Sequence, residues 1–189
     1  MGIDNWVVIN KKGLFRNGVL LVAGHLTPEQ VYSELKCNYP KFYKMDKLCK
    51  WAFVATECLL GDSINTETDK NKIGVMLSTS HGCLDVDKRY ADAAIPSPSL
   101  FVYTLPNIML GEIGIRHGFK GEQVCTVNER FDASELYFAT TVMLETKHMD
   151  ACLTGWVDVS EEGADICMFW VSPAGDNFKP GLLAELYHK

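Results

Sequence analysis

An unbroken apolar run limits which folds are open to this chain. The segment "KIGVMLST", residues 72–79, is rich in branched side chains, a pattern typical of a strand that is covered on both faces. Apolar residues recur with a helical period at residues 45–60, which predicts an amphipathic helix that stops at Gly61-Asp62. Residues 133–147 are apolar most of the way round, so this helix belongs in the middle of a structure, covered on more than one side. A buried strand with helices to cover it predicts an α/β protein.

The N-terminal segments continue the alternation of strands and helices. Short strands are expected at residues 6–10 and 18–24, with a turn-like stretch between them. A helix then begins at Pro28, with Thr27 as its cap, and fades near Lys36.

The middle of the chain is richer in proline and glycine. A polar helix is expected at about residues 86–94, and the run at 96–106 holds three prolines, which favours an extended loop over a strand. Asn107 is expected to cap the helix that follows. Gly111 and Gly114 lie on one face of that helix and would permit another backbone to approach closely.

The C-terminal third predicts a strand at 123–128 and a hairpin of two strands, 149–159 and 164–172, joined by an acidic turn. A short helix at 180–189 follows. We therefore expect a single domain, residues 1–189, with an α/β fold: a mixed β-sheet with helices packed on both faces.

Composition and charge exclude several classes of function. The net charge is −6 and no stripe of lysine and arginine is present, so nucleic acid is not an expected partner. No segment is apolar enough to span a bilayer and the N-terminus lacks a secretory signal, which predicts a soluble, cytoplasmic protein. The seven cysteines form no C-x-x-C pair and no Cys/His cluster. Buried free thiols are expected, and neither a metal site nor a cofactor.

Four segments in a fixed order resemble a known family. They are "YPKFYKMDKLCKWAFVATECLLGD", "KIGVMLSTSHGCLDVDKRY", "SPSLFVYTLPNIMLGEIGIRHGFKGE" and "MDACLTGWVDV". Together they resemble the N-terminal half of a β-ketoacyl synthase of the thiolase superfamily, over roughly residues 40 to 160. The resemblance implies a thiolase-like half-fold.

Complete members of that family join an acyl chain to malonyl carried on acyl carrier protein. A cysteine in a "TAC" tripeptide, at the start of the central helix, holds the acyl chain as a thioester, and two histidines come from the second half of the fold. In this sequence the family spacing places the tripeptide on Asn128, Glu129 and Arg130. Arg130 therefore stands where the resemblance places the nucleophile.

Arg130 cannot carry an acyl chain, because its guanidinium stays protonated. We expect it to pair with a carboxylate of this chain or of a partner chain, since Glu129, Asp132 and Glu135 lie close in sequence. Asp132 with Glu135 three residues later also predicts a capping box at the start of the 133–147 helix.

Other reactive residues offer weak replacements for the cysteine. Cys125 is expected to be buried in a strand, and the hydroxyl of Ser134 to satisfy backbone N–H groups in the first helical turn. His81 follows a strand in a glycine-containing loop, where α/β proteins often bind ligands, and is a possible ligand-loop residue. His117 is expected at a surface turn. The remaining histidines, without apparent partners, are His25, His148 and His188.

The loss of the family's cysteine, with Arg130 in its place, favours an accessory role. We expect a non-catalytic, chain-length-factor-like partner of an active ketosynthase in fatty acid, polyketide or aryl polyene biosynthesis. The central helix needs a cover, so a homo-oligomer or a heteromer with a catalytic ketosynthase is expected.

Two alternatives remain open from the sequence. One is a 3-oxoacyl carrier-protein synthase or another thioester-processing enzyme on the same scaffold. The other is a binding module for acyl chains or for acyl carrier protein. A patch of Lys41, Lys44, Lys47 and Lys50 could attract the acidic carrier protein, although such lysines more commonly form a solvated helix face.

Overall fold

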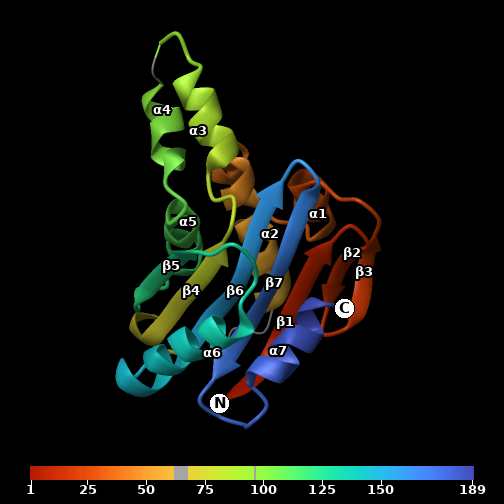
Figure 1. Ribbon diagram of the computed structural model, residues 1–189, viewed down its shortest axis with the longest axis vertical. Helices are drawn as coiled ribbons and strands as arrows, with labels where there is room; N and C mark the ends of the chain where they lie inside the picture. Colours follow the sequence, from red (N-terminus) through yellow and green to blue (C-terminus); the bar gives the residue numbers. More distant parts are fainter. Residues whose placement is uncertain (62–67, 96) are drawn as a thin grey trace.

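A mixed sheet of seven strands runs through the molecule in the order β3-β2-β1-β7-β6-β4-β5 (Figure 1). The structure is a computed structural model that describes residues 1–61, 68–95 and 97–189. Its strands are β1 (Gly2–Asn10), β2 (Gly13–Arg16), β3 (Val19–Ala23), β4 (Ile73–Thr79), β5 (Gln123–Val127), β6 (Ala151–Ser160) and β7 (Gly163–Ser172). β4 pairs in parallel with β5 and β6, and the other neighbours are antiparallel. The predicted mixed sheet is confirmed.

The N-terminal hairpins differ from the sequence prediction. The stretch expected to be only a turn contains β2, which pairs with β1 and with β3. The turn between β2 and β3 is formed by Asn17 and Gly18, both with positive φ. Asn-Gly is the sequence that a two-residue hairpin turn favours, because both of its residues tolerate a left-handed backbone. That dipeptide was the signal for a second hairpin.

One face of the sheet is covered by the long helix α2 (Lys47–Leu60), with α1 (Pro28–Glu34), the 3-10 turn η1 (Pro40–Lys44) and α5 (Ile108–His117) beside it (Figure 1). α2 begins at Asp46, whose carboxylate accepts hydrogen bonds from the N–H groups of Leu48 and Cys49, and it ends at Gly61 with φ +49°. The predicted helix is confirmed, although Asp62 lies outside the described residues. Thr27 caps α1 as predicted, with Gln30 completing a capping box.

The opposite face is covered by α6 (Ala133–Thr141), its continuation η4 (Val142–Thr146), which is a π-helix, and α7 (Pro180–Tyr187). Leu136, Met143 and Leu183 are buried against this face. β4, between the two layers, is buried along its whole length, as its apolar run predicts. Helices therefore pack on both faces of the sheet, as expected.

The outer side of α6 is more exposed to solvent than expected for a helix covered on more than one side. Leu136 and Thr140 are buried against the sheet, whereas Phe138 is 69% exposed and Ser134 is also exposed. The chain itself covers one side of this helix, and the cover expected on the other side is needed mainly by Phe138.

A helical arm extends away from the sheet at the top of Figure 1. It contains α3 (Leu84–Ala91), α4 (Pro98–Phe101) and the 3-10 turn η3 (Val102–Thr104). The expectation of an extended loop at 96–106 is wrong in the described part: Ser97 caps α4 and Pro98 occupies the first helical turn, where proline is favourable. Pro96 lies outside the described residues.

Two expectations about α5 need correction. Asn107 precedes this helix, but its side chain makes no capping hydrogen bond. A β-carbon at Gly114 would lie 3.2 Å from the carbonyl oxygen of Phe119, whereas one at Gly111 would meet no atom within 4 Å. Of these two glycines, therefore, only Gly114 is closely approached by another part of the backbone. A 3-10 turn, η2 (Lys70–Lys72), leads into β4.

No helix in the described ranges is long and apolar enough to cross a membrane.

Candidate functional site

The carboxyl ends of β4, β5 and β6 meet at one edge of the sheet, because these three strands are parallel. The turn after β5 is tied to the turn after β4 by two hydrogen bonds. The N–H of Asn128 donates to the carbonyl oxygen of Thr79 at 2.9 Å, and the Ser80 hydroxyl donates to the carbonyl oxygen of Glu129 at 3.3 Å. Residues from two distant parts of the sequence therefore share this edge, where α/β proteins commonly bind ligands.

Arg130 lies in the turn between β5 and α6, two residues before the helix cap, and is exposed. No carboxylate of the described residues lies within ion-pair distance of its guanidinium. The pairing expected within the chain is therefore absent among those residues. Pairing with a partner chain remains a prediction.

Asp132 caps α6 as predicted, and its carboxylate accepts hydrogen bonds from the N–H groups of Ser134 and Glu135. The reciprocal half of the predicted capping box is absent, since the Glu135 carboxylate accepts a hydrogen bond from the Asn128 side chain. The Asn128–Glu135 contact closes the turn that carries Glu129 and Arg130. The capping role expected of the Ser134 hydroxyl belongs to Asp132.

His81 and Asp158 form the most developed polar pair at this edge. Nδ1 of His81 lies 2.7 Å from Oδ2 of Asp158. The other oxygen, Oδ1, accepts hydrogen bonds from the Thr79 hydroxyl at 3.0 Å and from the N–H groups of Ser80 and His81 at 2.9 and 2.8 Å. The turn after β4 thus wraps around one carboxylate from β6.

Asp158 is buried, and two effects on its pKa oppose each other. Burial alone would raise the pKa, but the hydrogen bonds from His81, Ser80 and Thr79 outweigh it and hold the pKa below its ordinary value. Asp158 is therefore ionised at neutral pH and acts only as an acceptor. Nδ1 of His81 must then carry a hydrogen, which leaves Nε2 for a ligand.

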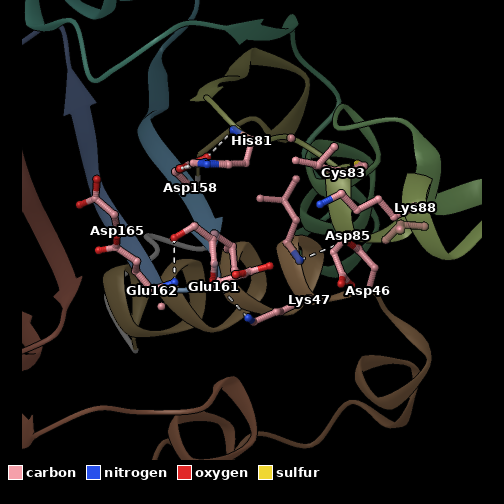
Figure 2. Close-up of a pocket in the computed structure, with 17 residues that line it drawn as sticks. Asp46, Lys47, His81, Cys83, Asp85, Lys88, Asp158, Glu161, Glu162 and Asp165 are labelled. Carbon is pink, nitrogen blue, oxygen red and sulfur yellow. Dashed lines mark hydrogen bonds and ion pairs between the residues drawn. The ribbon is translucent and has the colours of Figure 1, made fainter.

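A cavity of about 730 Å³ opens beside this pair (Figure 2). His81 and Asp158 line it from the sheet edge, Lys47 from the start of α2, Lys88 from α3, and Glu161 from the turn between β6 and β7. The His81 side chain is 46% exposed. The loop that carries His81, which the sequence suggests as a ligand-binding position, therefore lies beside a cavity.

The thiols near this edge are poor nucleophiles. Burial raises the pKa of Cys83, which lines the cavity, to about 12. Burial also raises the pKa of Cys125, half-buried in β5, to about 11. Both thiols are protonated at neutral pH, and the thiolate is the reactive form.

His117 is not at a surface turn, contrary to expectation. Its side chain is only 12% exposed, lies 3.3 Å from Glu57 and stacks on Phe119. Burial lowers the pKa of His117 to about 4. Glu57 also binds the Arg116 guanidinium through two hydrogen bonds, at 2.7 and 3.1 Å, so this cluster joins α5 to α2.

The lysines proposed as a docking patch are largely engaged within the chain. Lys41 pairs with the buried Glu112 at 2.7 Å, and Lys50 pairs with Glu29 at 2.7 Å. Lys47 reaches the carbonyl oxygen of Ser160 at 3.5 Å. His25, His148 and His188 are exposed. Of these residues, Lys47 lines the cavity beside His81.

Asp158 is the residue of this site that sequence reasoning missed. Its signal was a carboxylate inside the otherwise apolar strand segment "LTGWVDV". An acidic residue in a buried strand requires hydrogen-bond donors. Which donors they are follows only from the parallel register of β4 and β6.

No family model matches the chain, and no curated protein matches it. Several solved structures do match its fold. The ishigamide ketosynthase/chain length factor matches with a TM-score of 0.65 and 17% identity, covering 91% of this chain and 62% of that chain. The ketosynthase ApeO in complex with its chain length factor ApeC, from Xenorhabdus doucetiae, matches with a TM-score of 0.63 and 13% identity, covering 99% of this chain and 90% of that chain.

A third match is the AntDE:AntF complex of a type II polyketide synthase acyl carrier protein with its ketosynthase. It has a TM-score of 0.63 and 13% identity, and covers 90% of this chain and 61% of that chain. The chain thus spans about three fifths of the first and third of these structures and nearly all of the matched chain in the second. The chain has the α/β fold of these ketosynthase and chain length factor structures.

Proposed function

We propose that this protein is a non-catalytic, ketosynthase-like accessory chain that acts beside an active ketosynthase in fatty acid, polyketide or aryl polyene biosynthesis. The observation that carries the proposal is Arg130. This residue lies in the turn between β5 and the central helix α6, and its side chain cannot form a thioester. The cysteines near that turn, Cys83 and Cys125, have raised pKa values.

The proposal treats residues 1–189 as one domain of the β-ketoacyl synthase N-terminal type. A cytoplasmic location goes with it, because seven free cysteines suit a reducing compartment. The ApeO–ApeC match supports a chain of this size on this fold, since the chain matched in that complex is close to this one in length.

One side of the molecule supports the proposed association. β5 is an edge strand that pairs with β4 alone in the part of the chain that the structure describes, and it exposes Val124 and Val127. Figure 1 shows β5, α5 and the helical arm along this side. Exposed apolar residues on these elements are Ile115, Phe101, Val102 and Leu105. An edge strand flanked by apolar side chains is a typical template for a second chain.

Co-expression tests the accessory role. The chain is expressed with a ketosynthase that keeps its cysteine and both histidines, taken from the same genome, and the two are purified through a tag on one of them. The expected result is a stable heteromer whose products differ in acyl chain length from those of the ketosynthase alone. A monomer that leaves the products of every such ketosynthase unchanged would contradict the proposal.

Intact-protein mass spectrometry separates this role from that of an enzyme. The His81–Asp158 pair beside a cavity is the one observation that favours a thioester-processing enzyme. After incubation with acyl carrier protein thioesters, the accessory role predicts no covalent adduct on this chain, whereas a cysteine-bearing ketosynthase in the same tube is acylated. An acyl adduct on this chain would favour the enzyme.

A further inference from the structure

The walls of the cavity beside His81 carry an excess of negative charge, since six carboxylates and two lysine side chains line it. Four of the carboxylates belong to the β6–β7 hairpin: Asp158, Glu161, Glu162 and Asp165. Figure 2 shows these four along one side of the cavity, with Lys88 on the other side. Lys47 contacts the hairpin through the carbonyl oxygen of Ser160, and Lys11 pairs with Glu162 at 2.8 Å. Two ammonium groups are therefore set against four carboxylates on the hairpin.

Two of these carboxylates lie directly opposite each other. Asp158 of β6 and Asp165 of β7 are partners in the antiparallel register, and both line the cavity. Like charges at such positions repel each other and destabilise a sheet. The donors to Asp165, Trp156 at 3.1 Å and Tyr187 at 2.6 Å, are neutral groups that satisfy one oxygen without removing the charge. A cation in the cavity would reduce the repulsion across the hairpin.

The cavity also presents hydrogen-bond acceptors without donors. Among the described residues, no hydrogen bond or ion pair reaches the Glu161 carboxylate, and both donors to Asp165 bond its Oδ2, which leaves Oδ1 open. Because Nδ1 of His81 donates to Asp158, Nε2 of the neutral ring is a further acceptor. An alkylammonium group has three N–H donors and no acceptor, which matches this set.

An apolar part of the wall favours an organic cation. Leu48 and Val86 are buried and line the cavity, and Val159 is half-buried there. The volume of about 730 Å³ leaves room for a small organic molecule. In the part of the chain that the structure describes, no three His, Cys, Asp or Glu side chains are placed to hold a metal ion. A cation with a short hydrocarbon chain would contact both the carboxylates and the apolar wall.

We propose that the cavity binds a short-chain alkylammonium ion, with its ammonium group beside the Asp158–Asp165 pair and Glu161 and its alkyl chain against Leu48 and Val86. No covalent bond forms or breaks, and His81 keeps its protonation state. The inference concerns a ligand site of this chain and does not depend on the proposed accessory function.

Butylammonium chloride is the probe that tests this site, because its amine is protonated at pH 7.5, like that of a lysine side chain. The full chain, labelled with ¹⁵N, is titrated with it at constant ionic strength while the amides of Gly82 and Gly163, which line the cavity, are followed by NMR. The expected result is a saturable shift of both signals. Sodium butyrate, with an alkyl chain of similar length and the opposite charge, should give no saturable shift, and neither should potassium chloride.

Four variants locate the interaction. E161Q removes an exposed carboxylate and should weaken butylammonium binding about fivefold. D165N should weaken it about tenfold or more, because a less exposed charged acceptor is lost. K88Q removes a competing ammonium group and should bind the probe equally or more tightly. E145Q, the same charge change at an exposed position outside the cavity, is the matched control and should bind like the parent.

Four outcomes would overturn the inference: no saturable shift with butylammonium, tighter binding of butyrate, displacement of butylammonium by potassium at equal concentration, or unchanged binding in both E161Q and D165N. E161Q changes an exposed side chain and keeps the test valid where D165N fails to fold. A chain that binds butylammonium but never associates with a ketosynthase would contradict the proposed function and leave the alkylammonium site standing.

Discussion

Asp158 joins β6 to the turn after β4 through hydrogen bonds with three residues, Thr79, Ser80 and His81. Asp158→Asn removes the charge and weakens the bond to His81, leaving buried donors poorly satisfied. We expect the free energy of unfolding to fall by about 2 to 3 kcal/mol, measured by urea denaturation at pH 7. Asp176→Asn, at an exposed position, is the control and should change it by less than about 0.5 kcal/mol.

Asp158→Asn should also change how the free energy of unfolding depends on pH in acid. The folded-state pKa of Asp158 lies below its ordinary value, so this group stabilises the fold above the unfolded-state pKa. That stabilisation is lost as the pH falls through the folded-state pKa, below about 4. Asp158→Asn should lack this acid-dependent component, and an acid profile identical to that of the parent would contradict the assignment.

His117 makes stability depend on pH in a different window. Its pKa is about 4 in the fold, lowered from 6.5 by burial. Between pH 6.5 and 4 the unfolded chain binds a proton that the folded chain does not, so stability falls as the pH falls, by roughly 3 kcal/mol in all. Below pH 4 this contribution is constant.

His117→Asn should remove that slope, measured as the free energy of unfolding at pH 7 and at pH 4.5. His148→Asn is the matched control at an exposed histidine, and it should keep the slope of the parent. Equal slopes in the two variants would show that His117 is not the group responsible.

At the start of α6, a single side chain provides the cap. Asp132→Ala leaves the N–H groups of Ser134 and Glu135 without their acceptor and should destabilise the fold by about 1 kcal/mol. Ser134→Ala changes an exposed hydroxyl and should shift the free energy of unfolding by less than about 0.5 kcal/mol. Thermal denaturation followed by circular dichroism compares the two, and a larger loss in Ser134→Ala would return the capping role to that hydroxyl.

The helices and strands show where sequence patterns succeed. α2, β4 and the β6–β7 hairpin were predicted because their signals lie within the element: a helical period, a continuous apolar run and an acidic turn between two apolar runs. β2 was missed because "GLFR" is short and has no alternation of its own. The proline-rich run at 96–106 was misjudged because proline, which breaks strands, also begins helices.

The sheet ends in two edge strands, β3 and β5, and both expose apolar side chains. The proposed association assigns a partner chain to β5 only. Val127 of β5 is 63% exposed and Val19 of β3 is 62% exposed. Val127→Lys should abolish co-purification with the ketosynthase, since a charge would be buried in the interface. Val19→Lys is the matched control at the opposite edge and should leave it unchanged.

Both variants should have the same free energy of unfolding as the parent, because neither side chain packs in the monomer core. Loss of co-purification in Val19→Lys alone would move the proposed interface to the β3 edge. Retention in both would exclude either edge strand as an essential contact.

The local patterns of this sequence were enough to predict a layered α/β fold, the central strand, the main helices and the cap at Asp132, because each depends on residues a few positions apart. The His81–Asp158 pair joins residues 77 positions apart, and the burial of His117 depends on the neighbouring helix α2. Polar contacts of this kind follow from strand register and helix placement, which the whole core determines. The cavity beside His81, and the exposed place of Arg130, could therefore be seen only after the sheet was assembled.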